Sequence, residues 1–187
     1  MVKLNKIYTR TGDKGTAGLV DGSHVSKASD RMAAIGEVDE ANAAVGVAIA
    51  ALGEDRLAGQ LRLIQNELFD LGADIATPGD VEGALRIIPQ QVERLEHEID
   101  AMNAELEPLQ SFILPGGSAE VAALHLARTV VRRAERAAVA LAESDQINPH
   151  ALAYLNRLSD HLFVAARYIA VRQGGDILWE PGATSGQ

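Results

Sequence analysis

The chain has 187 residues, long enough for one buried core, and its composition gives no reason to expect a second domain. It contains no cysteine, which excludes disulfide frameworks, thiolate metal sites and cysteine nucleophiles. Its formal net charge of −9 argues against nucleic acid or an anionic membrane as the main partner, so an anionic ligand would need a local basic cluster. We therefore treat residues 1–187 as a single domain.

Residues 1–28 form a glycine-rich segment that we predict to be an irregular loop. It carries Gly12, Gly15, Gly18, Gly22, Arg10, Lys14 and Lys27. Glycines let backbone N–H groups approach an anion, and threonine hydroxyls and lysine ammoniums add donors, so the loop suits a polyphosphate. Asp13 is suited to orient a lysine or to help hold Mg²⁺. The spacing matches neither common nucleotide fingerprint, and an ordinary surface loop remains the alternative.

The opening sequence MVKLNKIYTRTG lacks an apolar leader region. The longest apolar run, Ala43 to Leu52, is far shorter than the roughly 18 residues that a membrane span needs. We expect a cytoplasmic protein without a membrane partner.

Hydrophobic residues at alternating spacings of three and four then predict five helices. The first is capped by Ser29 or Asp30 and ends at Gly53. Its row of hydrophobic positions, here called the seam, has one polar member, Asn42. We interpret Asn42 as a buried amide that fixes the register of the helices, in preference to a ligand contact. The second carries a seam from Leu57 to Ile75, and a solvated connection follows.

The third helix begins at Pro89 and its seam runs to Leu106, shortly before Pro108. The sequence SFILPGGS follows at 111–118 and supplies a serine cap for the fourth helix. The fifth has a seam from Leu155 to Ile169, and the tail 176–187 is predicted to be irregular. The predicted fold is an all-α five-helix bundle spanning 29–175, and additional alanine-rich faces favour an oligomer.

Polar residues on the fourth helix step by three and four, which places them on one stripe opposite the apolar seam. They are His125, Arg128, Arg132 and Glu135, with Arg136 at the edge. Arginine forks match phosphate oxygens, although a solvent-facing row of ion pairs explains the pattern as well. On the fifth helix Asn156 lies on a polar face, and His161 is interpreted as a surface or cap histidine.

No di-iron, zinc-protease or serine-hydrolase motif is present. The residues by themselves therefore lead to a helical oligomer with a phosphate-rich ligand.

Three blocks, IYTRTGDKGTAGL, SFILPGGS followed by ARTVVRRAER, and YLNRLSDHLFVAAR, together resemble the cob(I)alamin adenosyltransferases of the propanediol-utilisation type. The resemblance covers nearly the whole chain and implies a homotrimeric five-helix bundle. It also implies transfer of the 5′-deoxyadenosyl group of ATP to the cobalt of reduced vitamin B12, with release of triphosphate. Implied ligands are ATP, Mg²⁺ and cobalamin.

The resemblance also implies roles for individual residues. In the ATP loop it assigns Thr9, Arg10, Thr11, Gly12, Asp13, Lys14, Gly15, Ala17, Gly18 and Lys27. From the helices it assigns Arg132, Arg133, Glu135, Arg136 and the adenosine-side Asn156. Phe112 corresponds to the aromatic residue beneath the corrin ring, and we expect it, Lys14 and Arg132 to carry the chemistry. No residue is assigned as a metal ligand.

The same resemblance places the site between subunits, with Asp39 paired to Arg128 across the interface and possible handover of product to a B12-dependent enzyme. Two positions depart from the family pattern, His24 in place of an arginine and Ala17 in place of serine or threonine, and each removes a phosphate donor. The alternatives are another ATP-dependent transferase on the same bundle and a non-catalytic cobalamin carrier.

Overall fold

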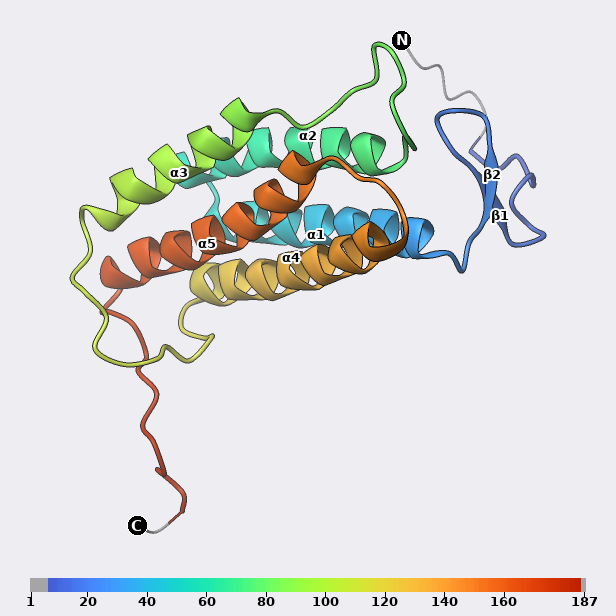
Figure 1. The fold of residues 1–187 in the computed structure, drawn as a ribbon. Helices are drawn as coiled ribbons and strands as arrows, with labels where there is room; N and C mark the ends of the chain where they lie inside the picture. The colour runs from blue at the N-terminus through green and yellow to red at the C-terminus, as the bar shows by residue number, and fades with distance from the viewer. Residues whose placement is uncertain (1–6, 186–187) are drawn as a thin grey trace.

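The computed structural model describes residues 7–185 and shows a bundle of five helices with a small two-stranded sheet beside it (Figure 1). The elements are β1 (Thr16–Gly18), β2 (His24–Ser26), α1 (Asp30–Leu52), α2 (Arg56–Ile75), α3 (Pro89–Asn103), α4 (Ala119–Ser144) and α5 (Pro149–Val171). The predicted helical class is confirmed, because all five predicted helices are present in the predicted order.

The helix ends follow from local capping chemistry. Side-chain oxygens of Ser29, Ser118 and Asn148 accept from backbone N–H groups in the first turns of α1, α4 and α5. At the other end of α1, Gly53 adopts a φ of 63°, which glycine tolerates and most residues avoid.

The third helix is shorter than its seam predicted, since it ends at Asn103 and leaves Leu106 outside. Arg167 of α5 donates to the Glu107 carbonyl at 2.9 Å and holds this segment as a loop. Pro108 also disfavours helical backbone at the residue before it.

The core forms where α1, α4 and α5 pack together, with α2 against α1 and α3 against α5. Its closest layers are built from small side chains: Ala34, Ala41 and Ala48 of α1, Ala127, Ala134 and Ala138 of α4, and Ala151, Ala165 and Ala166 of α5 are all buried. Larger leucines fill the wider spaces towards α2 and α3. Alanine lets helix backbones approach closely, so polar residues beside this layer are held in fixed relative positions.

The predicted irregular N-terminal loop contains a hairpin. β1 and β2 pair antiparallel with Ala17 opposite Val25, and Leu19 N–H donates to the Ser23 carbonyl at 2.8 Å to close the turn. Strands of three residues in a glycine-rich segment are too short to show alternating hydrophobicity, so the pattern of residues did not predict them. The expectation of a wholly irregular loop is therefore corrected.

Asn42 is buried between α1 and α2, as its place in the seam predicted. Its amide donates to the Gln65 carbonyl at 3.0 Å, and the Gln65 amide donates to the Asn42 carbonyl at 3.2 Å. The reciprocal pair fixes the register of the two helices.

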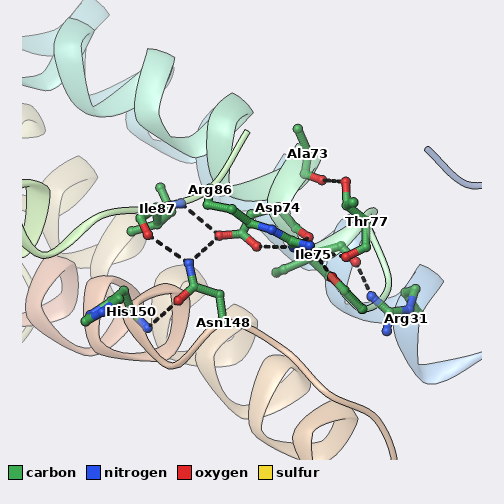
Figure 2. Close-up of polar contacts among 10 residues, drawn as sticks. Arg31, Ala73, Asp74, Ile75, Thr77, Arg86, Ile87, Asn148 and His150 are labelled. Carbon is green, nitrogen blue, oxygen red and sulfur yellow. Dashed lines mark hydrogen bonds and ion pairs between the residues drawn. The ribbon is translucent and has the colours of Figure 1, made fainter. Parts of the chain in front are cut away.

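The connection between α2 and α3 is exposed at 79–83, at Leu85 and at Ile88, and it is anchored at Arg86 and Ile87 (Figure 2). The buried Asp74 carboxylate accepts from Arg86 at 2.7 Å, from the Ile87 amide at 2.8 Å and from the Asn148 amide at 2.7 Å. One carboxylate thereby ties the end of α2, the connection and the start of α5 together. The interpretation as a plain solvated loop is wrong at Arg86 and Ile87.

A second polar cluster lies inside the bundle between α2, α3 and α5. His161 is fully buried and bonds the Glu98 carboxylate at 2.8 Å, so its interpretation as a surface histidine is wrong. Tyr154 donates to Glu67 at 2.6 Å, and Arg94 pairs with both carboxylates. Burial opposes ionisation of Glu98, but its bonds to His161 and Arg94 outweigh burial and lower its pKa.

We expect Asp74→Ala to destabilise the fold by about 3 to 5 kcal/mol, because it leaves a positive charge and two N–H donors without their acceptor. Asp80→Ala, at an exposed position of the same connection, is the matched control and should change stability by less than about 0.5 kcal/mol. Denaturant unfolding measures both. Equal midpoints for Asp74→Ala and the wild type would contradict the anchoring role.

Candidate active site

A surface groove lies over α4 and α5 and encloses about 390 Å³. It is lined by Arg132, Glu135, Arg136, Val139, Ala140, Glu143 and Asn156. Steps of three and four along α4 place its polar residues on one face, and packing against α5 brings Asn156 beside them. The structure thus brings together four of the residues assigned from the sequence.

Hydrogen bonds within the groove orient the Glu135 carboxylate and the Arg136 guanidinium. The Asn156 amide donates to Glu135 Oε1 at 2.7 Å, and Arg136 Nη1 donates to the Arg132 carbonyl at 3.0 Å. Arg132 itself is exposed, with its guanidinium available to a ligand.

The charges that line this groove balance, because two arginines face two glutamates. Such a groove can orient a nucleotide but cannot by itself neutralise a triphosphate. Further positive charge has to come from another part of the protein.

A larger hollow of about 700 Å³ lies at one end of the bundle, between the α2–α3 and α4–α5 connections. It is lined by several isoleucines and prolines and contains none of the residues assigned to ATP. We assign the site to the smaller groove because the exposed arginine and the oriented carboxylate lie there.

Arg133 lies outside the groove, although the sequence assigned it to ATP together with Arg132. It bonds Glu37 at 2.5 Å and also pairs with Glu40, both on α1. These hydrogen bonds, to Glu37 and then to Glu40, raise the pKa of the guanidinium. Adjacent helical residues point about 100° apart, so Arg132 and Arg133 serve different faces of α4.

His125 and Arg128, the first two residues of the polar stripe on α4, are more buried than a polar stripe opposite the core predicts. His125 is 2% exposed, and in the described chain neither of its ring nitrogens has a hydrogen-bond partner. Burial, and then the charge of Arg128, lower the pKa of His125. Burial, and then the charge of Arg132, lower the pKa of Arg128. The guanidinium carbon of Arg128 lies 5.9 Å from the centre of the Phe163 ring. The alternative of a solvent-facing row of ion pairs therefore does not hold at His125, which is buried.

The expected partner of Arg128, Asp39, is exposed on α1. Within residues 7–185 the structure records no bond between the two side chains. Their pairing across an interface stays a prediction.

The basic residues of the N-terminal loop lie together on an exposed surface. The Lys27 amide donates to the Gly15 carbonyl at 2.9 Å, and its ammonium lies 2.9 Å from where a Cβ at Gly12 would be. A side chain at Gly12 would displace the Lys27 ammonium and would also lie 3.2 Å from the Thr16 carbonyl oxygen. Arg10 adopts a φ of 61°, a left-handed conformation that is costly for arginine and frequent at functional sites.

The hairpin stands beyond the first turn of α1, to one side of the bundle (Figure 1). A hydrogen bond of 3.2 Å from the Val20 amide to the Ala76 carbonyl joins it to the end of α2. The loop thereby presents Lys14 and Lys27 to solvent.

Phe112 is 77% exposed, which argues against a core role for its ring. Its neighbour is Trp179, with ring centres 5.9 Å apart and planes at 66°. Ile113 and Leu178 form an antiparallel bridge, so the tail that was predicted to be irregular pairs with this segment. Residues 186–187 of that tail lie outside the described residues. Sequence reasoning missed Trp179, although it is the one tryptophan of an aromatic-poor chain.

Among residues 7–185, no group of three or more histidine, aspartate or glutamate side chains is arranged to hold a metal ion. In the same described range no helix combines the length and apolar character that crossing a bilayer demands.

Comparisons with known proteins show which family the chain resembles over most of its length. The family model for cobalamin adenosyltransferase matches residues 7–169. The chain is 50% identical to a corrinoid adenosyltransferase from Mycobacterium tuberculosis, over 97% of this chain and 96% of the relative. It is 46% identical to a corrinoid adenosyltransferase from Bacillus subtilis, over 95% of this chain and 94% of the relative.

A solved structure is also similar: a variant PduO-type ATP:corrinoid adenosyltransferase from Lactobacillus reuteri, complexed with cobalamin and ATP. Its TM-score is 0.89 at 41% identity, with 94% of this chain and 99% of that chain covered.

The lowered pKa of His125 predicts a pH dependence of stability. In the unfolded chain this group binds a proton near its ordinary pKa of 6.5, and in the folded chain it does so only at lower pH. The folded state therefore loses stability as pH falls below about 6.5, by up to about 1.4 kcal/mol per pH unit. His125→Leu should remove this part of the slope.

Denaturant unfolding of both proteins from about pH 8 to about pH 5 provides the measurement. The carboxylates titrate in both proteins, so their contribution cancels in the difference. Parallel stability curves for the wild type and His125→Leu would contradict a neutral, buried His125.

Proposed function

The chain belongs to the cobalamin adenosyltransferase family, and from this we propose that it transfers the 5′-deoxyadenosyl group of ATP to the cobalt of cob(I)alamin. The products are adenosylcobalamin and triphosphate. The observation that carries the proposal is the α4–α5 groove, where Asn156 orients Glu135 beside the exposed guanidinium of Arg132.

The reaction needs positioning and charge neutralisation more than it needs a base. Cob(I)alamin is a strong nucleophile: its cobalt electron pair forms the bond to C5′ as the bond from C5′ to the triphosphate oxygen breaks. The protein holds cobalt, C5′ and the leaving oxygen in line and offsets the charge that grows on the triphosphate. We assign that second task to Arg132, Lys14 and Lys27.

Mg²⁺ fits this assignment as an ion that arrives on ATP. Magnesium in nucleotide sites keeps several waters and phosphate oxygens and takes only one or two carboxylates from the protein. Asp13 adjoins Lys14 in sequence, and Glu135 lies three residues after Arg132, so each carboxylate is close in sequence to an assigned phosphate donor. Bound there, the ion would add to the neutralisation of the triphosphate.

We propose that the complete site forms between subunits of a homotrimer, with the loop of one chain over the α4–α5 groove of the next. The balanced charge of the groove supports this, because Lys14 and Lys27 then supply the missing positive charge. The hairpin projects from the bundle, as an arm that reaches a neighbour would. Large apolar side chains also stay exposed on the helices, among them Val47, Leu63, Phe69, Leu126 and Val139.

In this arrangement Arg128 gains Asp39 of the adjacent subunit, Phe112 lies beneath the corrin ring, and Arg133 acts by joining α4 to α1. The cytoplasm remains the expected compartment, and a B12-dependent enzyme the expected recipient of the product.

Anaerobic incubation with ATP, Mg²⁺ and cob(I)alamin tests the function. We expect the absorbance change of cobalt–carbon bond formation together with one triphosphate per adenosylcobalamin. ADP or AMP with a phosphorylated acceptor would indicate another ATP-dependent transferase. Cobalamin binding without turnover would indicate a carrier.

Arg132→Ala and Lys14→Ala should each lower turnover about 100-fold, because one charged donor in a shielded site contributes on the order of 3 kcal/mol to the transition state. Arg62→Ala, which removes an exposed arginine from α2, is the control and should leave turnover unchanged. Near-normal rates for both site variants would refute these assignments.

Charge reversal of Asp39 or Arg128 alone should weaken the trimer and ATP binding together, since each change leaves the other charge uncompensated. The double swap should recover part of the loss. Sedimentation and ATP titration provide the readout. The pair is not at the interface if both single variants stay trimeric with normal ATP affinity.

A further inference from the structure

The segment Ile177–Trp179 is bonded to the loop that carries Phe112. The Trp179 amide donates to the Phe112 carbonyl at 2.7 Å, and the Leu114 amide donates to the Ile177 carbonyl at 2.8 Å. Ser111 Oγ donates to the Trp179 carbonyl at 3.0 Å. These bonds hold the tail in register with the loop.

Arg167 of α5 fixes both segments to the bundle. Its Nε bonds Asp176, immediately before the tail segment, at 3.1 Å, and both side chains are mostly buried. Its Nη2 donates to the Glu107 carbonyl, a few residues before Phe112, at 2.9 Å. A single arginine therefore sets the tail and the loop relative to the same helix.

The paired segments carry apolar side chains that face solvent. Phe112, Leu114, Ile177, Leu178 and Trp179 are all exposed by 43% or more. A hollow of about 450 Å³ adjoins them, lined by Leu114, Ile177–Glu180 and Gly182–Thr184. Several large apolar groups gathered beside a hollow indicate a surface that binds something apolar.

The Phe112 ring is held by its edge-to-face contact with Trp179. With 77% of the residue exposed, little other packing restrains that ring. An aromatic pair of this geometry shifts a ring's orientation equilibrium by roughly 2- to 10-fold. The backbone bonds place the loop, and the indole ring of Trp179 contacts the Phe112 ring that the loop presents.

Resting on the function proposed above, we propose that Trp179 is a positioning residue for the corrinoid reaction: it holds the Phe112 ring against the lower face of the corrin. An apolar ring in that place excludes water and the lower base from cobalt and so eases reduction of cob(II)alamin. Trp179 acts through Phe112, and its contribution belongs to the reduction step.

Trp179→Ala should therefore lower the fraction of bound cob(II)alamin in the four-coordinate state roughly 2- to 10-fold with ATP present. Electron paramagnetic resonance measures this fraction. Adenosylation of prereduced cob(I)alamin, ATP affinity and the melting temperature should stay near wild type. Trp179→Phe should restore most of the four-coordinate state. Val81→Ala, which trims an exposed apolar side chain on the α2–α3 connection, is the control and should change none of these quantities.

Two outcomes would overturn the proposal. The first is a wild-type four-coordinate fraction in Trp179→Ala. The second is an equal loss in the cob(I)alamin and cob(II)alamin reactions, which would mean general disruption of the site. Addition of Trp179→Ala to Phe112→Ala should have no further effect, and a further loss would show that Trp179 acts by another route.

The ring contact is also testable without any reaction, because Trp179 is the chain's single tryptophan and its fluorescence reports this position alone. Phe112→Ala should shift the emission to longer wavelength and lower its anisotropy. Unchanged emission would mean that the rings do not touch in solution, and the proposal fails. Failure of the proposed function would differ, since the wild type would form no adenosylcobalamin while the fluorescence result stood.

Discussion

The close packing of α4 between α1 and α5 determines where the polar side chains of the candidate site lie. Buried alanines on all three helices let the backbones approach, and so fix which side chains of α4 meet each neighbour. Glu135 meets Asn156 of α5, Arg133 meets Glu37 of α1, and Arg132 is left facing solvent. A bulky residue at Ala127, Ala134 or Ala138 would separate these helices and alter every one of these contacts.

The charge on a triphosphate explains why the groove alone is an incomplete site. Its arginines are matched by glutamates, whereas the basic residues of the N-terminal loop stand exposed beyond the end of the bundle. Delivery of Lys14 and Lys27 to the groove of a neighbouring subunit would neutralise the leaving group only when the oligomer is assembled. Oligomerisation would then be part of the catalytic chemistry as well as a source of stability.

Sequence reasoning succeeded where local physics decides the outcome. The seams and caps, from Ser29 and Gly53 to Ser118, are local and predicted the helices closely. It failed where distant residues meet: Asp74 with Asn148, His161 with Glu98, and Phe112 with Trp179 are joined only by the fold. Arg133 is a different case: the helical period separates it from Arg132, and the structure pairs it with Glu37 of α1, while its assignment to ATP stays a prediction.

In the proposed trimer each site takes its loop from one subunit and its groove from another, so a mixture of two inactive variants should regain activity. Lys14→Ala and Arg132→Ala proteins are unfolded together in equal amounts, refolded and assayed for adenosylcobalamin. If the loop serves a neighbouring subunit, about one site in three of each mixed trimer combines an intact Lys14 with an intact Arg132. Random mixing makes about three quarters of the trimers mixed, so about a quarter of all sites are intact and activity should return to roughly that share of the wild type. If the mixture stays as inactive as either variant alone although sedimentation shows mixed trimers, both halves of the site belong to one chain and the account is wrong.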